Sequence, residues 1–136
     1  MKVANKQFDE ILSEVNSSDD VQAALKVIIN QPWIKFYLSQ LTSEDWPDFD
    51  VNEVKFTQHN YHRSMAGALL LNKQTANIYK VIFMSNEVPL KTKQHQCKAL
   101  LEMLCKGESD ILRVLLTKNL QLIYPNITYN IINSVL

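Results

Sequence analysis

The last eighteen residues of this sequence, Asn119 to Leu136, include no side chain that carries a charge. Charged residues make up 21% of the whole chain, so this segment differs sharply from the rest. An uncharged and largely apolar segment is costly to leave in water, and the fold is therefore expected to cover it. The segment is expected to pack either against the core of the same chain or against a second copy of the chain, because interface cores are also depleted of charge.

Length and composition predict one globular domain that spans residues 1–136. A chain of 136 residues, 46% of them hydrophobic, can bury a sizeable core but is too short for two ordinary domains. Only two glycines occur, Gly67 and Gly107. P-loop and dinucleotide-binding loops need several glycines close together, so both of these classes are excluded.

The first third of the sequence predicts three helices. Apolar residues recur at the spacing of one helical face from Phe8 to Val15, which predicts a helix over residues 4–15. A second helix is expected over residues 19–30. A third is expected over residues 32–41, with Pro32 in its first turn, where the missing N–H costs nothing.

In the middle of the sequence the apolar spacing changes to two, which is typical of strands. Strands are expected over residues 51–63, 65–71 and 78–84, with a turn at 72–77 between the last two. The alternation of Tyr79, Val81 and Phe83 indicates one face of the third strand. We expect these segments to pair as an antiparallel sheet.

Two further helices are expected after the sheet. One covers residues 91–106 with Gly107 at its C-cap, and the next covers 109–119 and begins at Ser109. Residues 120–124 are expected to form a short strand, followed by a helix or a strand beyond Pro125. The predicted fold class is α+β, with N-terminal helices, an antiparallel β-sheet in the middle and C-terminal helices packing on the sheet.

The two halves of the sequence carry opposite charges. Residues 1–53 contain ten acidic residues and four lysines, a net charge of −6, and residues 54–136 contain ten basic and four acidic residues, a net charge of +6. The halves are expected either to neutralise each other or to present a basic surface to an anionic ligand or partner. Lys91, Lys93 and His95 lie at an expected helix start, where backbone N–H groups also favour an anion.

No metal site, cofactor or reactive thiol is expected. His59, His62, His95 and Cys97 are of types that bind zinc. However, positions three apart on a strand point to opposite faces, so His59 and His62 diverge. Cys97 and Cys105 lie on the apolar stripe of an expected helix, where buried thiols are inert, and they are too far apart along it for a disulfide.

The chain is expected to be cytoplasmic. Acidic residues occur by position nine and no long apolar run is present, so neither a signal peptide nor a membrane span is expected. Two free thiols without a secretion signal favour a reducing compartment. Nucleic-acid binding is not expected, since Arg63 and Arg113 are the only arginines.

Three stretches, HRSMAGALLLN, IYKVIFMSNEVP and KALLEMLCKGESDILRVLLT, resemble the chorismate lyase-like proteins. The resemblance covers about residues 61–117. It implies an antiparallel sheet flanked by helices and a small buried pocket for an aromatic carboxylate, which Arg63 would bind. Enzymes of that family also use a glutamate late in the chain. The last acidic residue here is Asp110, so the catalytic acid is not matched.

Two functions are therefore weighed. The first is a small non-enzymatic interaction module of the adaptor, chaperone-like or immunity type. It would bind a partner chain through its sheet or through residues 119–136, or would form a homodimer. The second is a pocket protein, with or without lyase activity, that holds a small anionic aromatic ligand with Arg63, Lys80 or Arg113. The first is favoured, because no catalytic constellation stands out in the sequence.

Overall fold

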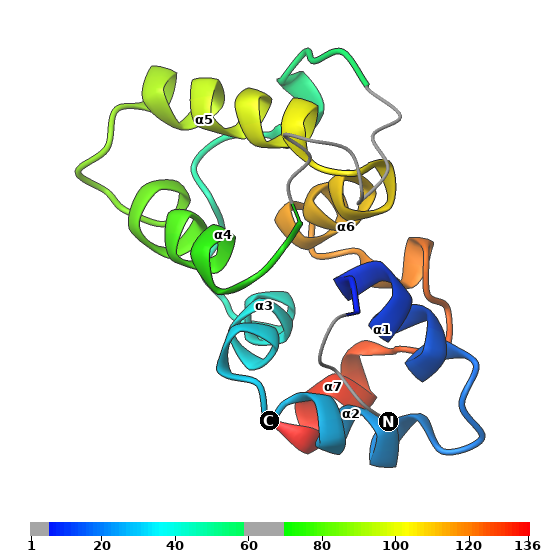
Figure 1. The fold of residues 1–136 in the computed structure, drawn as a ribbon. Coiled ribbons are helices and arrows are strands. Elements are labelled where there is room, and N and C mark those ends of the chain that lie inside the picture. The colour runs from blue at the N-terminus through cyan, green and yellow to red at the C-terminus, as the bar shows by residue number, and fades with distance from the viewer. Residues whose placement is uncertain (1–5, 59–69) are drawn as a thin grey trace.

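The structure, a computed structural model, describes residues 6–58 and 70–136. In these residues the fold consists of helices and contains no sheet (Figure 1). The α-helices are α1 (Phe8–Asn16), α2 (Val21–Ile28), α3 (Pro32–Thr42), α4 (Lys73–Ile78), α5 (Leu90–Met103), α6 (Lys106–Leu116) and α7 (Tyr129–Val135). Two 3₁₀ turns, η1 (Val51–Glu53) and η3 (Leu120–Leu122), and a π-helix, η2 (Tyr79–Phe83), complete the described elements.

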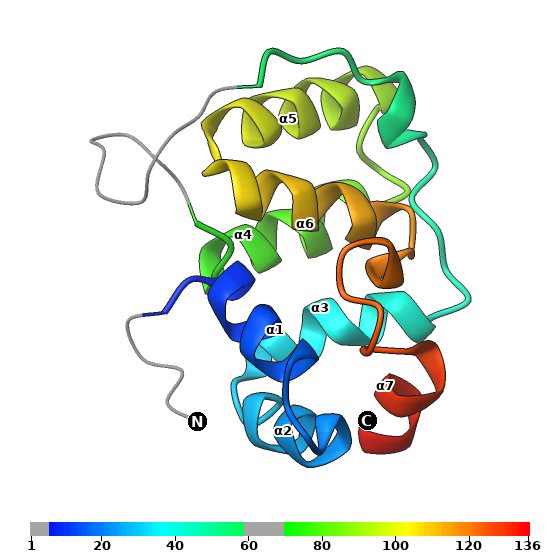
Figure 2. The same cartoon turned by 90° about the vertical axis from the view of Figure 1, so that its right-hand side faces the viewer.

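Helix α6 lies at the centre of the fold (Figure 2). It packs against α1, α3, α5, η1 and η3. Its buried positions lie on more than one face, which is the pattern of a helix surrounded by others. They are Glu108, Ser109, Ile111, Leu112, Val114, Leu115 and Leu116. The buried apolar side chains of the protein form one continuous cluster that extends from Phe8 to Ile132.

A buried carboxylate near the start of α6 joins three segments of the chain. Glu108 has no exposed surface. Its Oε1 accepts hydrogen bonds from the backbone N–H groups of Phe8 at 3.1 Å and Leu71 at 3.2 Å, and its Oε2 accepts one from Asp9 at 2.9 Å. The first N–H groups of α1 have no partner within their own helix, so Glu108 caps α1 from a distant position in the sequence.

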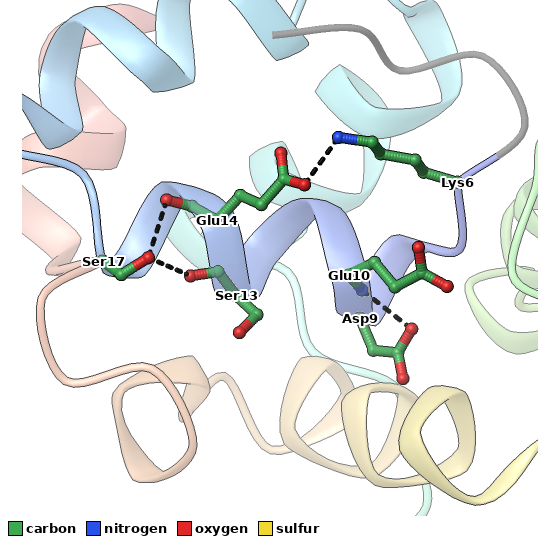
Figure 3. Close-up of polar contacts among 6 residues, drawn as sticks. All are labelled: Lys6, Asp9, Glu10, Ser13, Glu14 and Ser17. Atoms are coloured by element: carbon green, nitrogen blue, oxygen red, sulfur yellow. Dashed lines mark hydrogen bonds and ion pairs between the residues drawn. The ribbon is translucent and has the colours of Figure 1, made fainter.

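Asp9 lies against the same part of α6. Figure 3 shows its carboxylate pointing from α1 toward α6, while Lys6, Glu14 and Ser17 bond along the outer side of α1. A Cβ built on Gly107 would lie 2.2 Å from Asp9 Oδ2 and 3.0 Å from Asp9 Cγ. Gly107 is therefore needed for the close approach of α1 and α6. The sequence-based assignment of Gly107 as a C-cap is wrong, because it is the second residue of α6.

Burial raises the pKa of both carboxyl groups. The pKa of Glu108 rises to about 7, because the loss of solvent, together with the nearby charge of Asp9, outweighs the three N–H bonds that favour the anion. The pKa of Asp9 is also raised, chiefly by burial. The free energy gained by capping α1 is thus opposed by the cost of burying a charge.

The uncharged segment 119–136 is partly covered by the core. Leu120, Tyr124, Ile127 and Ile132 are buried, and α7 packs on α2 and α3. The Tyr124 hydroxyl donates to the carbonyl of Asp9 at 3.2 Å, which ties the segment to the start of α1. Ile131 and Val135 are partly buried and pack against the same core, whereas Leu122, Ile123, Tyr129 and Leu136 are exposed. The expectation of core packing is therefore confirmed for part of the segment.

The prediction of an α+β fold with an antiparallel sheet is wrong for the described residues. Residues 78–84, expected to be a strand, belong mostly to α4 and η2. The buried residues of this region follow the spacing of a helix, not that of a strand. Thr75, Ala76, Tyr79 and Phe83 are buried, whereas Val81 is 50% exposed. The segment read as a turn supplies the helix start, since Asn72 and Thr75 form a reciprocal capping box.

The other expected strands also require correction. Residues 51–58 contain the turn η1 followed by irregular chain, and residues 120–124 contain the turn η3. The expected strand at 65–71 lies largely outside the described residues, as does the end of the one at 51–63. The three N-terminal helices are confirmed, with the expected apolar face of α1 buried and Pro32 at the start of α3.

Two details of the later helices differ from expectation. α6 begins at Lys106, and Ser109 does not cap it but lies buried and donates from its hydroxyl to the carbonyl of Leu101 at 3.1 Å. Residues 126–136, left open between helix and strand, contain α7, which is capped by Thr128. Cys97 and Cys105 are buried, as expected, and form no disulfide with each other, and burial raises the pKa of the Cys97 thiol to about 12.

The contact between Gly107 and Asp9 gives a prediction of coupling. Gly107→Ala is expected to lower the free energy of unfolding by about 1 to 3 kcal/mol, because the new methyl group overlaps the Asp9 carboxylate. The same change in an Asp9→Ala background should be neutral or stabilising, because alanine favours a helix more than glycine does. Urea denaturation of the four proteins measures this, and additive effects of the two substitutions would contradict the contact.

The raised pKa of Glu108 predicts how the free energy of unfolding changes with pH. Its pKa is about 7 in the folded protein against an ordinary value of 4.5. Between these two values the folded protein keeps a proton that the unfolded chain has lost. The free energy of unfolding should therefore fall as the pH rises across this window, by on the order of 3 kcal/mol. Asp9 contributes in the same direction.

Urea denaturation at intervals from about pH 5 to pH 8 measures this slope. Glu108→Gln should flatten most of it, although the variant is less stable overall because its amide caps α1 less well. A wild-type stability that increases with pH over the window would show that the three N–H bonds outweigh the cost of burial.

Candidate protein-interaction groove

A surface hollow of about 1010 Å³ lies between α3 and α4. A second hollow, of about 400 Å³, continues from it toward Trp46. Phe36 of α3 and Lys80 of η2 line both hollows, so the two are continuous. We call this surface the α3–α4 groove. α3 forms one wall of the larger hollow, and α4 followed by η2 forms the other. The loops that follow α3 and η2 complete the lining of the smaller hollow with Asp45, Trp46, Met84 and Asn86.

Two interactions fix the spacing of the walls. The buried Tyr37 hydroxyl of α3 donates to Thr75 Oγ1 of α4 at 2.9 Å. Thr75 is held in turn by the capping box with Asn72. Leu71, which precedes this cap, donates its N–H to Glu108 and so ties the start of the α4 wall to α6. The larger hollow is therefore built on a hydrogen-bonded framework of helices, whereas the smaller hollow is lined mostly by loop residues.

The apolar lining of the groove is aromatic. Trp33 and Phe36 are half-buried and line the groove from α3. Behind them, the Trp33 ring meets the buried Phe8 ring edge to face at 5.2 Å between centroids, and Phe36 meets Tyr79 in the same way at 5.8 Å. Aromatic side chains held from behind lose little conformational entropy when a ligand covers their open side.

The far end of the groove is held by Lys118. This residue follows α6 in the left-handed region, with a φ of 54°. Its ammonium donates to the carbonyls of Ser43 and Asp45, the latter at 2.6 Å, and lies 4.7 Å from the centroid of the Trp46 ring. Trp46 remains 60% exposed. The lysine thus fixes the chain that follows α3 and presents an indole at the end of the groove.

The charged residues that line the larger hollow of the groove are all positive, whereas Asp45 lines the smaller hollow beside Trp46. α3 contains Lys35 and no acidic residue, and α4 with η2 contains Lys73 and Lys80 and no acidic residue. Lys73 and Lys80 line the groove, are exposed, and form no ion pair with any residue that the structure describes. The N-terminal half of the chain is strongly acidic, so α3 is a local exception to its charge.

The structure does not bring the predicted ligand-binding residues together. Arg63 lies outside the described residues. Lys80 lines the α3–α4 groove, whereas Arg113 lines a separate hollow beside Leu122 and stacks over the Phe56 ring, with its guanidinium carbon 5.7 Å from the centroid. The pocket for an aromatic carboxylate therefore remains a prediction from the sequence.

One of the three residues of the expected anion site at the start of α5, Lys93, already forms an ion pair within this chain. Lys91 and His95 are exposed, but Lys93 is 1% exposed and its ammonium donates to Asp48 Oδ1 at 2.8 Å. Asp48 is thus the anion that neutralises Lys93. Lys93 ties α5 to the loop between α3 and η1, and the anion site remains a prediction that rests on Lys91 and His95.

The described residues offer little for catalysis. They include no group of three His, Cys, Asp or Glu side chains placed to hold a metal ion. His59 and His62, weighed as zinc ligands, lie outside the described residues. Glu108 has the raised pKa that a general acid needs, but it has no exposed surface through which a substrate could reach it. Its role is to hold α1, α4 and α6 together.

Comparisons with protein-family models, with curated proteins and with solved structures find no match to this chain. The resemblance to the chorismate lyase-like proteins therefore rests on the quoted stretches alone, and the sheet that it implies is not found in the described residues. None of the described helices combines the length and apolar composition needed to cross a membrane.

Sequence reasoning did not identify Trp33, Phe36 or Lys73 as groove residues. A signal was present, because the apolar residues of α3 extend over more than the one face that faces the core. Ile34, Tyr37 and Leu38 fill the core, which leaves the adjacent aromatic residues on a second face. The partner wall could not be found, since residues 78–84 were read as a strand.

The ion pair of Lys93 gives a prediction. Asp48→Asn is expected to lower the free energy of unfolding by about 1 to 2 kcal/mol, because it leaves a buried ammonium without its counter-charge. Glu44→Gln, which neutralises an exposed acid of the same loop, is the matched control and should change stability by less than about 0.5 kcal/mol. Equal effects of the two changes in urea denaturation would show that Asp48 does not neutralise Lys93.

Proposed function

We propose that this protein is a non-enzymatic interaction module that binds a segment of another protein in the α3–α4 groove. The proposal takes in the adaptor, chaperone-like and immunity types. The observation that carries the proposal is the pair of half-buried aromatic residues, Trp33 and Phe36, whose inner sides rest on the core while they line an open groove. Aromatic anchors in a preformed hollow are typical of the residues that dominate binding energy at protein interfaces.

Two further observations support the proposal. η2 is a π-helix within a groove wall, and single π-helical turns occur frequently at functional sites. The uncharged segment 119–136 supports the other wall, because α7 packs on α3. We also propose the cytoplasm as the site of action, on the ground that neither of the two buried cysteines forms a disulfide. A homodimer through the exposed Leu122 and Tyr129 remains a second form of the same proposal.

A peptide-display selection tests the proposed function. The full chain is immobilised and challenged with a library of random peptides of about fifteen residues, and enriched peptides are synthesised and their affinities measured by fluorescence anisotropy. Peptides that bind the groove should lose at least about tenfold in affinity to Phe36→Ala, since truncation of a central aromatic anchor costs 2 kcal/mol or more.

Val27→Ala is the matched control, because Val27 is an exposed apolar residue on α2 that does not line the groove. Circular dichroism of both variants checks that they remain folded. The proposal is wrong if no peptide is enriched, or if the enriched peptides bind the Phe36→Ala and Val27→Ala variants equally well.

A further inference from the structure

We infer that the segment bound in the α3–α4 groove is an amphipathic α-helix with acidic residues along its flank. This inference rests on the proposed function and deepens it by naming the chemistry of the partner. Three features of the groove support it: the backbone of its walls, the length of its lining stripe and the sign of its charges.

The backbone of the walls favours a helical partner over an extended one. An extended segment gains affinity from main-chain hydrogen bonds to the edge of a sheet. Both walls of the larger hollow are helices, whose interior N–H and C=O groups are already bonded within the helix. A buried extended chain would lose hydrogen bonds to water without replacement, whereas a helix brings its own.

The length of the groove matches a short helix. Along α3 the lining residues Trp33, Phe36 and Gln40 recur at a spacing of three and four, and Ser43 follows after the helix end. Ten residues at 1.5 Å per residue make a stripe about 15 Å long. A partner helix of about ten residues, with apolar side chains at the same spacing, can cover it.

The positive charge of Lys73 and Lys80 determines which charges are expected along the flank of the partner helix. Lys73 and Lys80 lie on the same wall, about two helical turns apart, and form no ion pair with any described residue. The larger hollow, which both lysines line, has no acidic residue in its lining that would repel a negative partner, and Asp45 lines only the smaller hollow at the far end of the groove. On the partner helix, acidic side chains along the flank that faces α4 and η2 would pair with these lysines, whereas basic side chains there would be repelled.

The pool enriched in the display selection tests the inference. Groove-dependent peptides are expected to carry a net negative charge, to place apolar residues at helical spacing, and to gain helical circular dichroism when bound. The double variant Lys73→Glu, Lys80→Glu should lower their affinity about tenfold or more, with the largest loss at low salt. Lys26→Glu, Lys98→Glu makes the same change of charge on α2 and α5, outside the groove, and should have less than a twofold effect.

The outcomes separate the inference from the proposed function. If the enriched peptides depend on Phe36 but are neutral, basic, or extended and proline-rich, the partner chemistry is wrong while the proposed function stands. Equal affinities of the two double variants also overturn the partner chemistry. If Trp33 fluorescence changes with the concentration of the protein alone, and light scattering shows a dimer that Phe36→Ala abolishes, the occupant is a second copy of the chain instead.

Discussion

The fold depends on one carboxylate that accepts three backbone N–H groups from two separate parts of the chain. Glu108 stands near the start of the central helix α6, and its two oxygens accept N–H groups from the start of α1 and from Leu71. Each of these groups would be costly to bury without a partner, and so would the carboxylate. The three hydrogen bonds offset part of both costs, and they hold α1 and the residues before α4 at fixed positions on α6. The close packing of Asp9 on Gly107 follows from this arrangement.

The groove is an extension of the same framework. Leu71 is held by Glu108, the next residue caps α4, and Thr75 of that cap bonds to Tyr37 of α3. A continuous series of hydrogen bonds therefore runs from the centre of the protein to both walls. Trp33 and Phe36 take their positions from the aromatic core behind them. A surface set in this way is largely preformed, which reduces the entropy that a partner must lose on binding.

Part of this structure can be predicted from the sequence. Where apolar residues repeat at the helical spacing and polar residues separate them, as in α1, the helix and its buried face are correctly predicted. The apolar spacing gives the wrong prediction at residues 78–84, because Tyr79, Val81 and Phe83 also fit a strand. The choice between helix and strand depends on the burial of Thr75 and Ala76, which precede them. Gly107 and Glu108 act through contacts with residues about a hundred positions away, which no local pattern reveals. The groove is hidden for the same reason, since its walls come from separate parts of the chain.

The separation of one hundred residues between Phe8 and Glu108 has a consequence for synthesis on the ribosome. Phe8 leaves the ribosome one hundred residues before the carboxylate that receives its N–H. At about 5 to 20 residues per second this delay lasts about 5 to 20 seconds. During that time the apolar side of α1 has neither its cap nor α6 to pack against. Until Glu108 has been made, α1 can bury its apolar side only against α2 and α3, which leaves part of that side open to chaperones that bind emerging polypeptides.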